Sequence, residues 1–520
     1  SLSRCQNQLG HAGAASGMLS LIKTSLCLQH RILPAWSDNP RNESSFRLQK
    51  PFSFGNFSTP WLKNADEPSR KAAVVLKSGK GSSEWILSEN ESSPRFEQHA
   101  RKGSYCFLPI SANNSEEFLK KLGELEKDPE LFESPKNFLY RAFQDFQNTD
   151  AEFSMVLLAE NPSKLKEEII QAQKSVSRCF EDGKDWQTPS GSFFTTKPLG
   201  QEKIAFVYPG GFNTYVGSGN SLFEMDPELH ERSLSYSSKI KTLLHPEFLF
   251  PQSPNFQSEE KLKQLQQQFY DSPNPMFESG ISSAVLATQV MRNAFGIEPH
   301  AAFGYSMGEV SMLFSLGVWG SMDPMSEVLN ASPLFHERIA GPMNSVREYW
   351  KLKDTDFQNE SLWNWYTLRA EPELVAKALE KRERVYLVLI NTPQEVVIAG
   401  EPSACKELIE ELQCESHEIP VTDVVHCPPV QSEYEEIKKV HTNKVVDKPK
   451  VDFFSAADYT TTKLDSEILA DNIARFYGRT VDFSKLVEEV YRSGARIFID
   501  MGPRSSCARW ISENLGHRPH

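Results

Sequence analysis

The amino-acid sequence predicts an α/β fold: a parallel sheet, a smaller βαββαβ unit inserted into it, and a small α/β domain in front. Two patterns indicate this architecture. From KIAFVYPGG at residue 203 onward, short apolar runs typical of buried parallel strands alternate with helical patterns. Between residues 361 and 420 a strand-helix-strand pattern occurs twice, as in a ferredoxin-like unit. With 39% hydrophobic and 24% charged residues among 520, the composition is that of a globular chain of several domains.

The first 200 residues divide into two predicted units. Residues 1–90 contain an apolar-periodic helix (MLSLIKTSLCLQH) that stops before Pro34 and two short strands (AAVVLK and EWILSE), and we interpret them as the tail of a larger domain. Residues 91–200 alternate strand and helix, through CFLPISA, FLKKLGELEK, SMVLLAE and KLKEEIIQAQKSV, and are expected to form a small α/β linker. Because the chain opens with neither Met nor a basic segment, we expect it to begin inside a longer polypeptide.

The main domain is predicted to be discontinuous. Residues 201–360 and 421–520 supply the parallel sheet, whose strands include KIAFVY, HAAFG, VDFFSAA and ARIFID, followed by a closing helix. Residues 361–420 form the smaller inserted subdomain, with the strands LWNWYTLRA, VYLVLIN, EVVIAG and SHEIPV and helices through ELVAKALEK and CKELIEELQ.

Composition and charge exclude several classes of function. The formal net charge is -13 and the sequence pI is about 5.5, so there is no overall cationic field for a nucleic acid. The most apolar N-terminal stretch is too interrupted for a membrane span. Eight cysteines lie scattered without zinc-site spacing, so we expect no metal and a reduced, cytoplasmic setting.

The clearest chemical motif is HAAFGYSMGEVSM. An apolar strand ends at Gly304, Ser306 follows within G-x-S-x-G, and a helix begins directly afterwards. Such a turn exposes a serine hydroxyl and aims helix N-terminal N–H groups at an oxyanion. The pentapeptide also fits an ordinary structural turn.

A nucleophilic serine needs a base, and His426 is the best candidate of twelve histidines. It lies in IPVTDVVHCPPV, where a strand breaks into a Pro-Pro loop, although most single histidines are merely satisfied or exposed. A second Gly-rich element, FVYPGGFNTYVGSG, could donate a backbone N–H from Gly210 or Gly211, or could be a plain strand-to-helix turn.

Together with NTPQEVVIAG and FIDMGP, these elements resemble the acyltransferase domain of fatty acid and polyketide megasynthases, from about Lys203 to Leu515. The preceding segment resembles the ketosynthase–acyltransferase linker, and QNQLGHAGAASGMLSLIK resembles a ketosynthase end in which His11 stands at the catalytic histidine. GPMNSVREYWKL and SFFTTKPLGQEKIAFVYPG are most similar to polyunsaturated fatty acid synthases and heterocyst glycolipid synthases. The resemblance implies a hydrolase-like acyltransferase core.

The resemblance also implies roles for single residues. Ser306 would accept the acyl group, His426 would be its base, the N–H groups of Met307 and Gly211 would form the oxyanion hole, and Asn391 would line the cleft. The positions of Glu278, Tyr305 and Ala331 would, with Asn391, bind the substrate. The chain departs from the family at Gly211 and Glu278, where Gln is common, and at Tyr305, where His is common. At Ala331 the malonyl-specific members have an arginine for the free carboxylate.

These departures favour uncharged acyl groups. The nearest arginine to Ala331 in the sequence is Arg338, and the malonyl signature before the base is replaced by Asp423-Val424-Val425-His426. The expected activity is transfer of an acyl group from acyl-CoA to the phosphopantetheine of an acyl carrier protein, alongside other synthase domains and without a bound cofactor. A basic run could dock that carrier or simply be solvated: Lys438, Lys439, Lys444, Lys448 and Lys450.

Three alternatives stay open. The same site could release the finished chain to water or an alcohol. An α/β-hydrolase shares the serine motif, but it needs an acid and then a histidine late in the chain. A docking module without activity is the third, and the retention of both Ser306 and His426 argues against it.

Overall fold

The computed structural model describes residues 12–13, 15–35, 55, 57–78, 81–90, 105–200, 202–226, 228–252, 258–353 and 361–520. The chain forms two compact units, one of residues 1–98 with 202–520 and the other of residues 99–201. The prediction that residues 1–90 are the tail of a larger domain stays a prediction. His11 lies outside the described residues.

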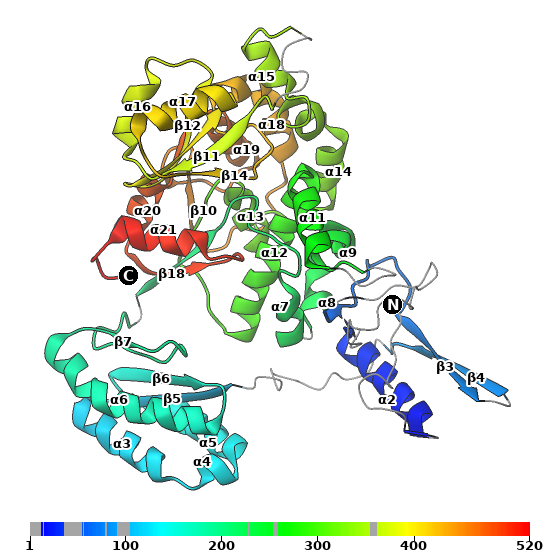
Figure 1. Ribbon diagram of the computed structural model, residues 1–520, viewed down its shortest axis with the longest axis vertical. Coiled ribbons are helices and arrows are strands. Elements are labelled where there is room, and N and C mark those ends of the chain that lie inside the picture. Colours follow the sequence, from blue (N-terminus) through cyan, green and yellow to red (C-terminus); the bar gives the residue numbers. More distant parts are fainter. Residues whose placement is uncertain are drawn as a thin grey trace. The chain divides into compact units, whose positions relative to one another are not determined.

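A five-stranded sheet forms the centre of the larger unit, in the order β16-β15-β10-β9-β18. Figure 1 labels β10 and β18 of this sheet. Four of its strands, β15, β10, β9 and β18, run parallel, as expected, and the short β16 is antiparallel to β15. The strands are β9 (Lys203–Tyr208), β10 (Ala301–Gly304), β15 (Asp452–Ser455), β16 (Thr460–Thr461) and β18 (Ala495–Asp500). Nearly every residue of β9 and β10 is buried, as in sheets covered on both faces.

Helices cover both faces of this sheet. α13 (Gly308–Ser315) packs against β9 and β10 and is itself covered by α12 (Pro273–Ala294), while α20 (Phe483–Arg492) and α21 (Ser506–Leu515) contact β18. Further helices of this unit are α7 (Asn220–Met225), α8 (Leu229–Ser233), α9 (Ile240–Leu243), α10 (Pro246–Leu249), α11 (Glu259–Tyr270), α14 (Asp323–Ala331), α15 (Asn344–Tyr349), α18 (Tyr434–His441) and α19 (Ser466–Tyr477). Two short turns, η2 (Leu334–Arg338) and η3 (Pro428–Glu433), are π-helical and 3₁₀-helical.

The inserted subdomain has the predicted βαββαβ order. Its elements are β11 (Asn364–Leu368), α16 (Pro372–Leu379), β12 (Val385–Thr392), β13 (Glu395–Gly400), α17 (Pro402–Leu412) and β14 (Ser416–Ile419). The sheet order is β14-β11-β13-β12-β17, so a fifth strand, β17 (Val481–Asp482), joins it from the end of the chain. On one face Tyr366 and Leu368 belong to a core with α16 and α17, and on the other face Trp365 belongs to the main core.

Two arginines of the N-terminal segment are buried, and one of their ion pairs reaches the main unit. Arg31 and Arg70 both contact Glu89, and Arg31 also contacts Glu231 on α8. The elements here are α2 (Ala15–His30), β1 (Ile32–Leu33), β2 (Thr59–Pro60), β3 (Lys71–Ser78) and β4 (Gly81–Ser88). These contacts explain why residues 1–98 group with 202–520.

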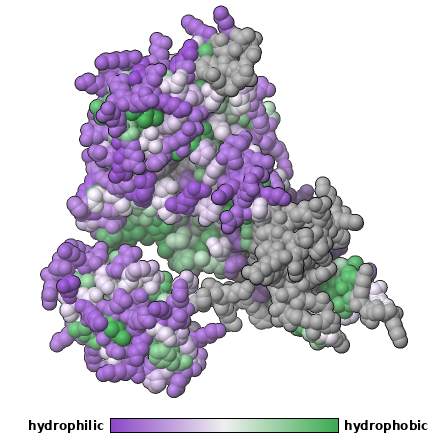
Figure 2. Space-filling view, in the orientation of Figure 1, coloured by the Kyte–Doolittle hydropathy of each residue, from purple (hydrophilic) through white to green (hydrophobic). Residues whose placement is uncertain are grey.

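Residues 99–201 have a core of their own. A four-stranded antiparallel sheet, β5-β6-β8-β7, carries the helices that were predicted from the sequence. Its elements are β5 (Cys106–Ala112), α3 (Ser115–Lys127), α4 (Glu130–Glu133), α5 (Pro135–Gln147), β6 (Phe153–Ala159), α6 (Pro162–Asp182), β7 (Trp186–Gln187) and β8 (Phe193–Phe194). Hydrophilic residues make up most of the coloured surface in Figure 2, in keeping with 24% charged residues.

Candidate active site

Ser306 lies in a sharp turn between β10 and α13. Its φ is +55°, a left-handed conformation that is strained for a residue with a side chain. The flanking glycines are required by close backbone approach, because a Cβ on Gly304 would lie 2.0 Å from the Glu309 nitrogen, and one on Gly308 would lie 1.9 Å from the Tyr208 oxygen. The G-x-S-x-G spacing is therefore what brings strand, serine and helix so close together.

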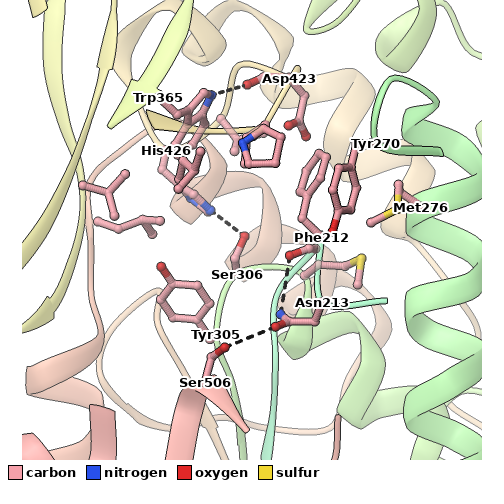
Figure 3. A pocket seen from close by; sticks show the side chains of 18 of the residues that line it. Phe212, Asn213, Tyr270, Met276, Tyr305, Ser306, Trp365, Asp423, His426 and Ser506 are labelled. Carbon is pink, nitrogen blue, oxygen red and sulfur yellow. Dashed lines mark hydrogen bonds between the residues drawn. The ribbon is translucent and has the colours of Figure 1, made fainter. Parts of the chain in front are cut away.

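His426 accepts a hydrogen bond from this serine. The distance from Ser306 Oγ to His426 Nε2 is 2.7 Å (Figure 3). His426 Nδ1 lies 3.0 Å from the backbone oxygen of Phe476. Since a carbonyl oxygen only accepts, Nδ1 carries the proton and Nε2 is free to act as the base. The imidazole is thus oriented by a backbone carbonyl and not by a carboxylate.

Burial determines the protonation state of His426. The residue is 1% exposed, and this burial lowers the pKa of its imidazole to about 4, against a smaller opposing effect of the Phe476 carbonyl. The ring also stacks on Phe476 with centroids 5.8 Å apart. His426 is therefore neutral at pH 7, as a general base must be.

Two backbone amides adjoin Ser306. Gly211 follows the end of β9 and Met307 directly precedes α13, and both line the cavity that contains Ser306. Neither amide donates a backbone hydrogen bond to any described residue. The role of both N–H groups as an oxyanion hole stays a prediction.

The cavity around Ser306 has a volume of about 320 Å³ and mainly apolar walls. The inserted sheet contributes Trp365, Leu389 and Val397, and the larger subdomain contributes Met276, Phe277, Phe335, Val425 and Tyr477. On β11 the alternation of side chains explains one wall, since Trp365 and Thr367 face the cavity while Tyr366 and Leu368 face the helices.

Two predicted site residues join at the cavity wall. The Tyr305 hydroxyl donates a hydrogen bond to Asn391 Oδ1 at 2.8 Å, and Asn391 Nδ2 donates to Glu395 Oε1 at 3.0 Å. Glu395 also accepts from Trp510 Nε1 at 2.6 Å and pairs with Arg509. Asn391 therefore lines the cleft and connects the two subdomains.

Glu278 does not line this cavity, although the sequence placed it with the substrate. Its side chain is 3% exposed, and its carboxylate lies 2.6 Å from His245 Nε2 and accepts a hydrogen bond from Asn330 at 3.0 Å. On α12 it is Met276 and Phe277 that contact the cavity. Glu278 belongs to a polar contact between α12, α14 and the α10 region.

Ala331 is likewise outside the cavity. It is the exposed last residue of α14, where Pro333 prevents the helix from continuing and the π-helical turn η2 follows. This turn brings Phe335 to the cavity instead. Arg338, further along the same turn, pairs with Glu348 and Glu433 and does not line the cavity.

Sequence reasoning missed two charged residues of the cavity. Arg504 follows β18 and donates to the Tyr270 hydroxyl at 2.8 Å, with its guanidinium 5.2 Å from the Tyr215 ring centroid. Asp423, three residues before the base, also lines the cavity. A polar residue just after the carboxyl end of a parallel strand was the available signal for Arg504.

The basic run is partly neutralised. Lys438 pairs with Glu467, and Lys439 pairs with Glu436. Docking of a carrier protein on these lysines stays a prediction. Among the described residues no helix is long and apolar enough to cross a membrane, and no group of three or more His, Cys, Asp or Glu could hold a metal.

Comparison with known proteins places similar sequences along the whole chain. Residues 1–38 match the family described as beta-ketoacyl synthase, C-terminal domain. A polyunsaturated fatty acid synthase polypeptide of Thraustochytrium sp. is 27% identical over 98% of this chain, and erythronolide synthase EryA2 of Saccharopolyspora erythraea is 21% identical over 98%. The chain spans only 26% and 13% of these two proteins.

Solved acyltransferase domains share the fold. The domain from module 8 of the salinomycin polyketide synthase has a TM-score of 0.60 at 18% identity, covering 79% of this chain and 88% of that one. The acyltransferase domain of SpnD has a TM-score of 0.58 at 16% identity, covering 80% and 89%. The resemblance and the fold class predicted from the sequence are both confirmed.

Proposed function

We propose that this chain is the acyltransferase part of a polyunsaturated fatty acid or polyketide type of synthase. In this proposal it moves an acyl group from acyl-CoA, through an ester on Ser306, to the phosphopantetheine thiol of an acyl carrier protein. The observation that carries the proposal is the 2.7 Å contact between Ser306 Oγ and His426 Nε2 beside an apolar cavity. Similarity to synthase proteins along the chain supports the choice of reaction.

Acylation begins when His426 Nε2 takes the proton of Ser306 as Oγ attacks the thioester carbonyl. The carbonyl oxygen becomes an oxyanion, and the N–H groups of Met307 and Gly211 stabilise it. Collapse of this intermediate breaks the carbon–sulfur bond, and the CoA thiolate leaves with the proton held by His426. In the second half the carrier thiol gives its proton to His426 as its sulfur attacks the ester carbonyl. The bond from the carbonyl carbon to Ser306 Oγ then breaks, and Oγ takes the proton back from His426.

A carbonyl partner in place of an acid suits this chemistry. The imidazolium that forms during each half-reaction donates from Nδ1 to the Phe476 oxygen at 3.0 Å, which stabilises it without a second buried charge. The same feature counts against the hydrolase alternative, which places an acid behind the histidine.

The walls of the cavity favour an uncharged acyl group. Phe335 reaches the cavity from the turn after α14. This turn follows Ala331, the position at which malonyl-specific relatives have an arginine. The ring centroids of Phe335 and Phe277 lie 5.7 Å apart. Val425 adds a branched side chain beside the base. A free carboxylate against these walls would lose its hydration, and Phe335, Phe277 and Val425 offer it no cationic partner.

Intact-protein mass spectrometry after incubation with a panel of acyl-CoAs tests the proposal. The protein should gain the mass of one acyl group, and Ser306→Ala should gain none while keeping its circular dichroism spectrum. Addition of a phosphopantetheinylated carrier protein should then remove that mass and acylate the carrier. Acylation of the Ser306→Ala protein would contradict the assignment, and loss of the acyl group to water alone would favour chain release.

A further inference from the structure

Asp423 is the single acidic residue among those that line the cavity. Its carboxylate points toward the space above Ser306 (Figure 3), and its Oδ1 atom is buried with no hydrogen-bond partner among the described residues. The backbone oxygen of Asp423 accepts a hydrogen bond from Trp365 Nε1 at 2.9 Å, which fixes this part of the loop. A buried carboxylate oxygen without a partner in an apolar cavity is costly, so its presence calls for an explanation.

No described cation pairs with Asp423. Arg504 lines the same cavity, but its guanidinium is exposed, donates to the Tyr270 hydroxyl and lies over the Tyr215 ring. Arg338 is paired with Glu348 and Glu433. The negative charge of Asp423 therefore acts on whatever enters the cavity.

The carboxylate is ionised under ordinary conditions. Burial raises the pKa of Asp423 to about 6, which leaves it charged at pH 8. The charge also affects Tyr477, which lines the same cavity. Burial is the main cause that raises the pKa of Tyr477 above its usual value, and the negative charge of Asp423 raises it further.

We propose that Asp423 is a selectivity residue that rejects acyl groups carrying a free carboxylate. The inference rests on the proposed acyl transfer through Ser306 and names the group that restricts its substrates. Two like charges in a partly dry cavity repel one another strongly, whereas a neutral acyl chain is not affected. This differs from the mere absence of an arginine, because a repelling charge can be removed by substitution.

The test compares two substrates of nearly the same shape. Malonyl-CoA ends in a carboxylate, and its half-amide carries –CONH₂ in the same place. In single-turnover acylation at pH 8, the wild-type protein should react at least about tenfold faster with the half-amide. Asp423→Asn, which keeps the shape and removes the charge, should reduce that ratio by about tenfold. Glu337→Gln, an exposed acid on the same turn as Phe335, should leave the ratio unchanged.

Each outcome decides between the two proposals. Equal rates for the two thioesters in the wild type, or the same ratio in Asp423→Asn, would overturn the selectivity proposal while leaving acyl transfer intact. If Asp423→Asn does not fold, Asp423→Ala, which also removes the charge, takes its place in the same comparison. If no thioester acylates Ser306, acyl transfer fails, and calorimetric binding of the two thioesters to Ser306→Ala still measures the charge preference. A wild-type preference for malonyl-CoA that Arg504→Gln abolishes would also overturn the proposal, because it would place the carboxylate on Arg504.

Discussion

At the residue scale, the burial of His426 decides how the site depends on pH. A buried imidazole without an acidic partner resists protonation, and its pKa falls from the usual 6.5 to about 4. Below pH 6.5 the unfolded chain binds a proton here that the folded chain does not. His426 therefore contributes stability that is present above pH 6.5 and is lost as the pH falls through about 4.

The acylation rate should follow the same group. With an uncharged acyl thioester, so that the charge of Asp423 does not enter, the single-turnover rate should stay constant from pH 8 to about 5.5 and fall only at lower pH. His426→Ala should slow acylation by about 100-fold or more at pH 7.5. Tryptophan fluorescence at each pH controls for unfolding. A rate that halves near pH 6.5 would show that the base is an ordinary, solvated histidine.

Arg504 should hold the anionic end of the donor. Its guanidinium lies exposed on the cavity lining and has no carboxylate within ion-pair distance among the described residues. Arg504→Gln should lower kcat/KM for acyl-CoA by about threefold to tenfold, which is the scale of an exposed charge pair. The kcat/KM for the N-acetylcysteamine thioester, which has no phosphate, should not change. The control is Arg292→Gln, which alters a guanidinium on α12 that pairs with Glu298. An equal loss with both thioesters would mean that Arg504 contacts the acyl group or the thioester.

The sequence predicted the residues whose chemistry follows from local spacing. G-x-S-x-G identified Ser306 because both glycines are imposed by backbone contacts within a few residues. The sequence identified His426 from its place in a loop after a strand. It could not predict the contact with Ser306, because that contact depends on the packing of segments 120 residues apart. Ala331 was misplaced because Pro333 ends α14 and a π-helical turn resets the register, so that Phe335 faces the cavity. Such a change of register cannot be counted from sequence spacing.

At the element scale, the two subdomains are joined by more than the chain connections. β17 extends the inserted sheet by pairing with β12, and Thr480 donates to the Leu387 oxygen at 2.6 Å beside it. The sequence predicted all six elements of the insertion from their periodicity. It could not predict β17, because two residues give no periodic signal and their pairing depends on tertiary contact.

Glu395 should hold the β12–β13 hairpin against α21. It is 6% exposed and accepts hydrogen bonds from Asn391, Arg509 and Trp510, and these donors together hold its pKa below the usual value despite burial. Glu395→Ala should lower the free energy of unfolding by about 1–3 kcal/mol, since the buried donors lose their acceptor, and should slow acylation through the Asn391–Tyr305 contact. Urea unfolding and single-turnover labelling measure the two effects. The control is Glu410→Ala, which removes an exposed acid on α17 and should change neither quantity. If Glu395→Ala left both the free energy of unfolding and the acylation rate unchanged, the hairpin would need no such connection.

At the scale of the whole molecule, the chain separates into units whose cores share no residue. The core of the smaller unit consists only of side chains between residues 106 and 194, among them Phe118, Leu157 and Phe194. Residues within the unit also define where its helices begin and end. Asn114 and Asn161 cap the N-termini of α3 and α6, and Gly183 ends α6 at φ +65°. The sequence could therefore predict this unit as a block, with its own strands and helices.

Residues 99–201 should accordingly fold when expressed alone. An antiparallel sheet covered by three long helices, with Phe118 packed 5.0 Å from Phe194 between ring centroids, is sufficient for a domain of this size. Urea should unfold the isolated segment in one cooperative transition with an m-value of about 1–2 kcal/mol/M.

Phe118→Ala should lower the free energy of unfolding of this segment by about 3–5 kcal/mol, because the ring is fully buried. Phe132→Ala, which removes a ring that is 49% exposed, should have much less effect. In the full chain Phe118→Ala should leave acylation of Ser306 unchanged, because the cavity draws on no residue of this unit. A segment that shows no cooperative transition, or a Phe118→Ala chain that loses acylation, would mean that the unit depends on the rest of the protein for its fold or supports the active site.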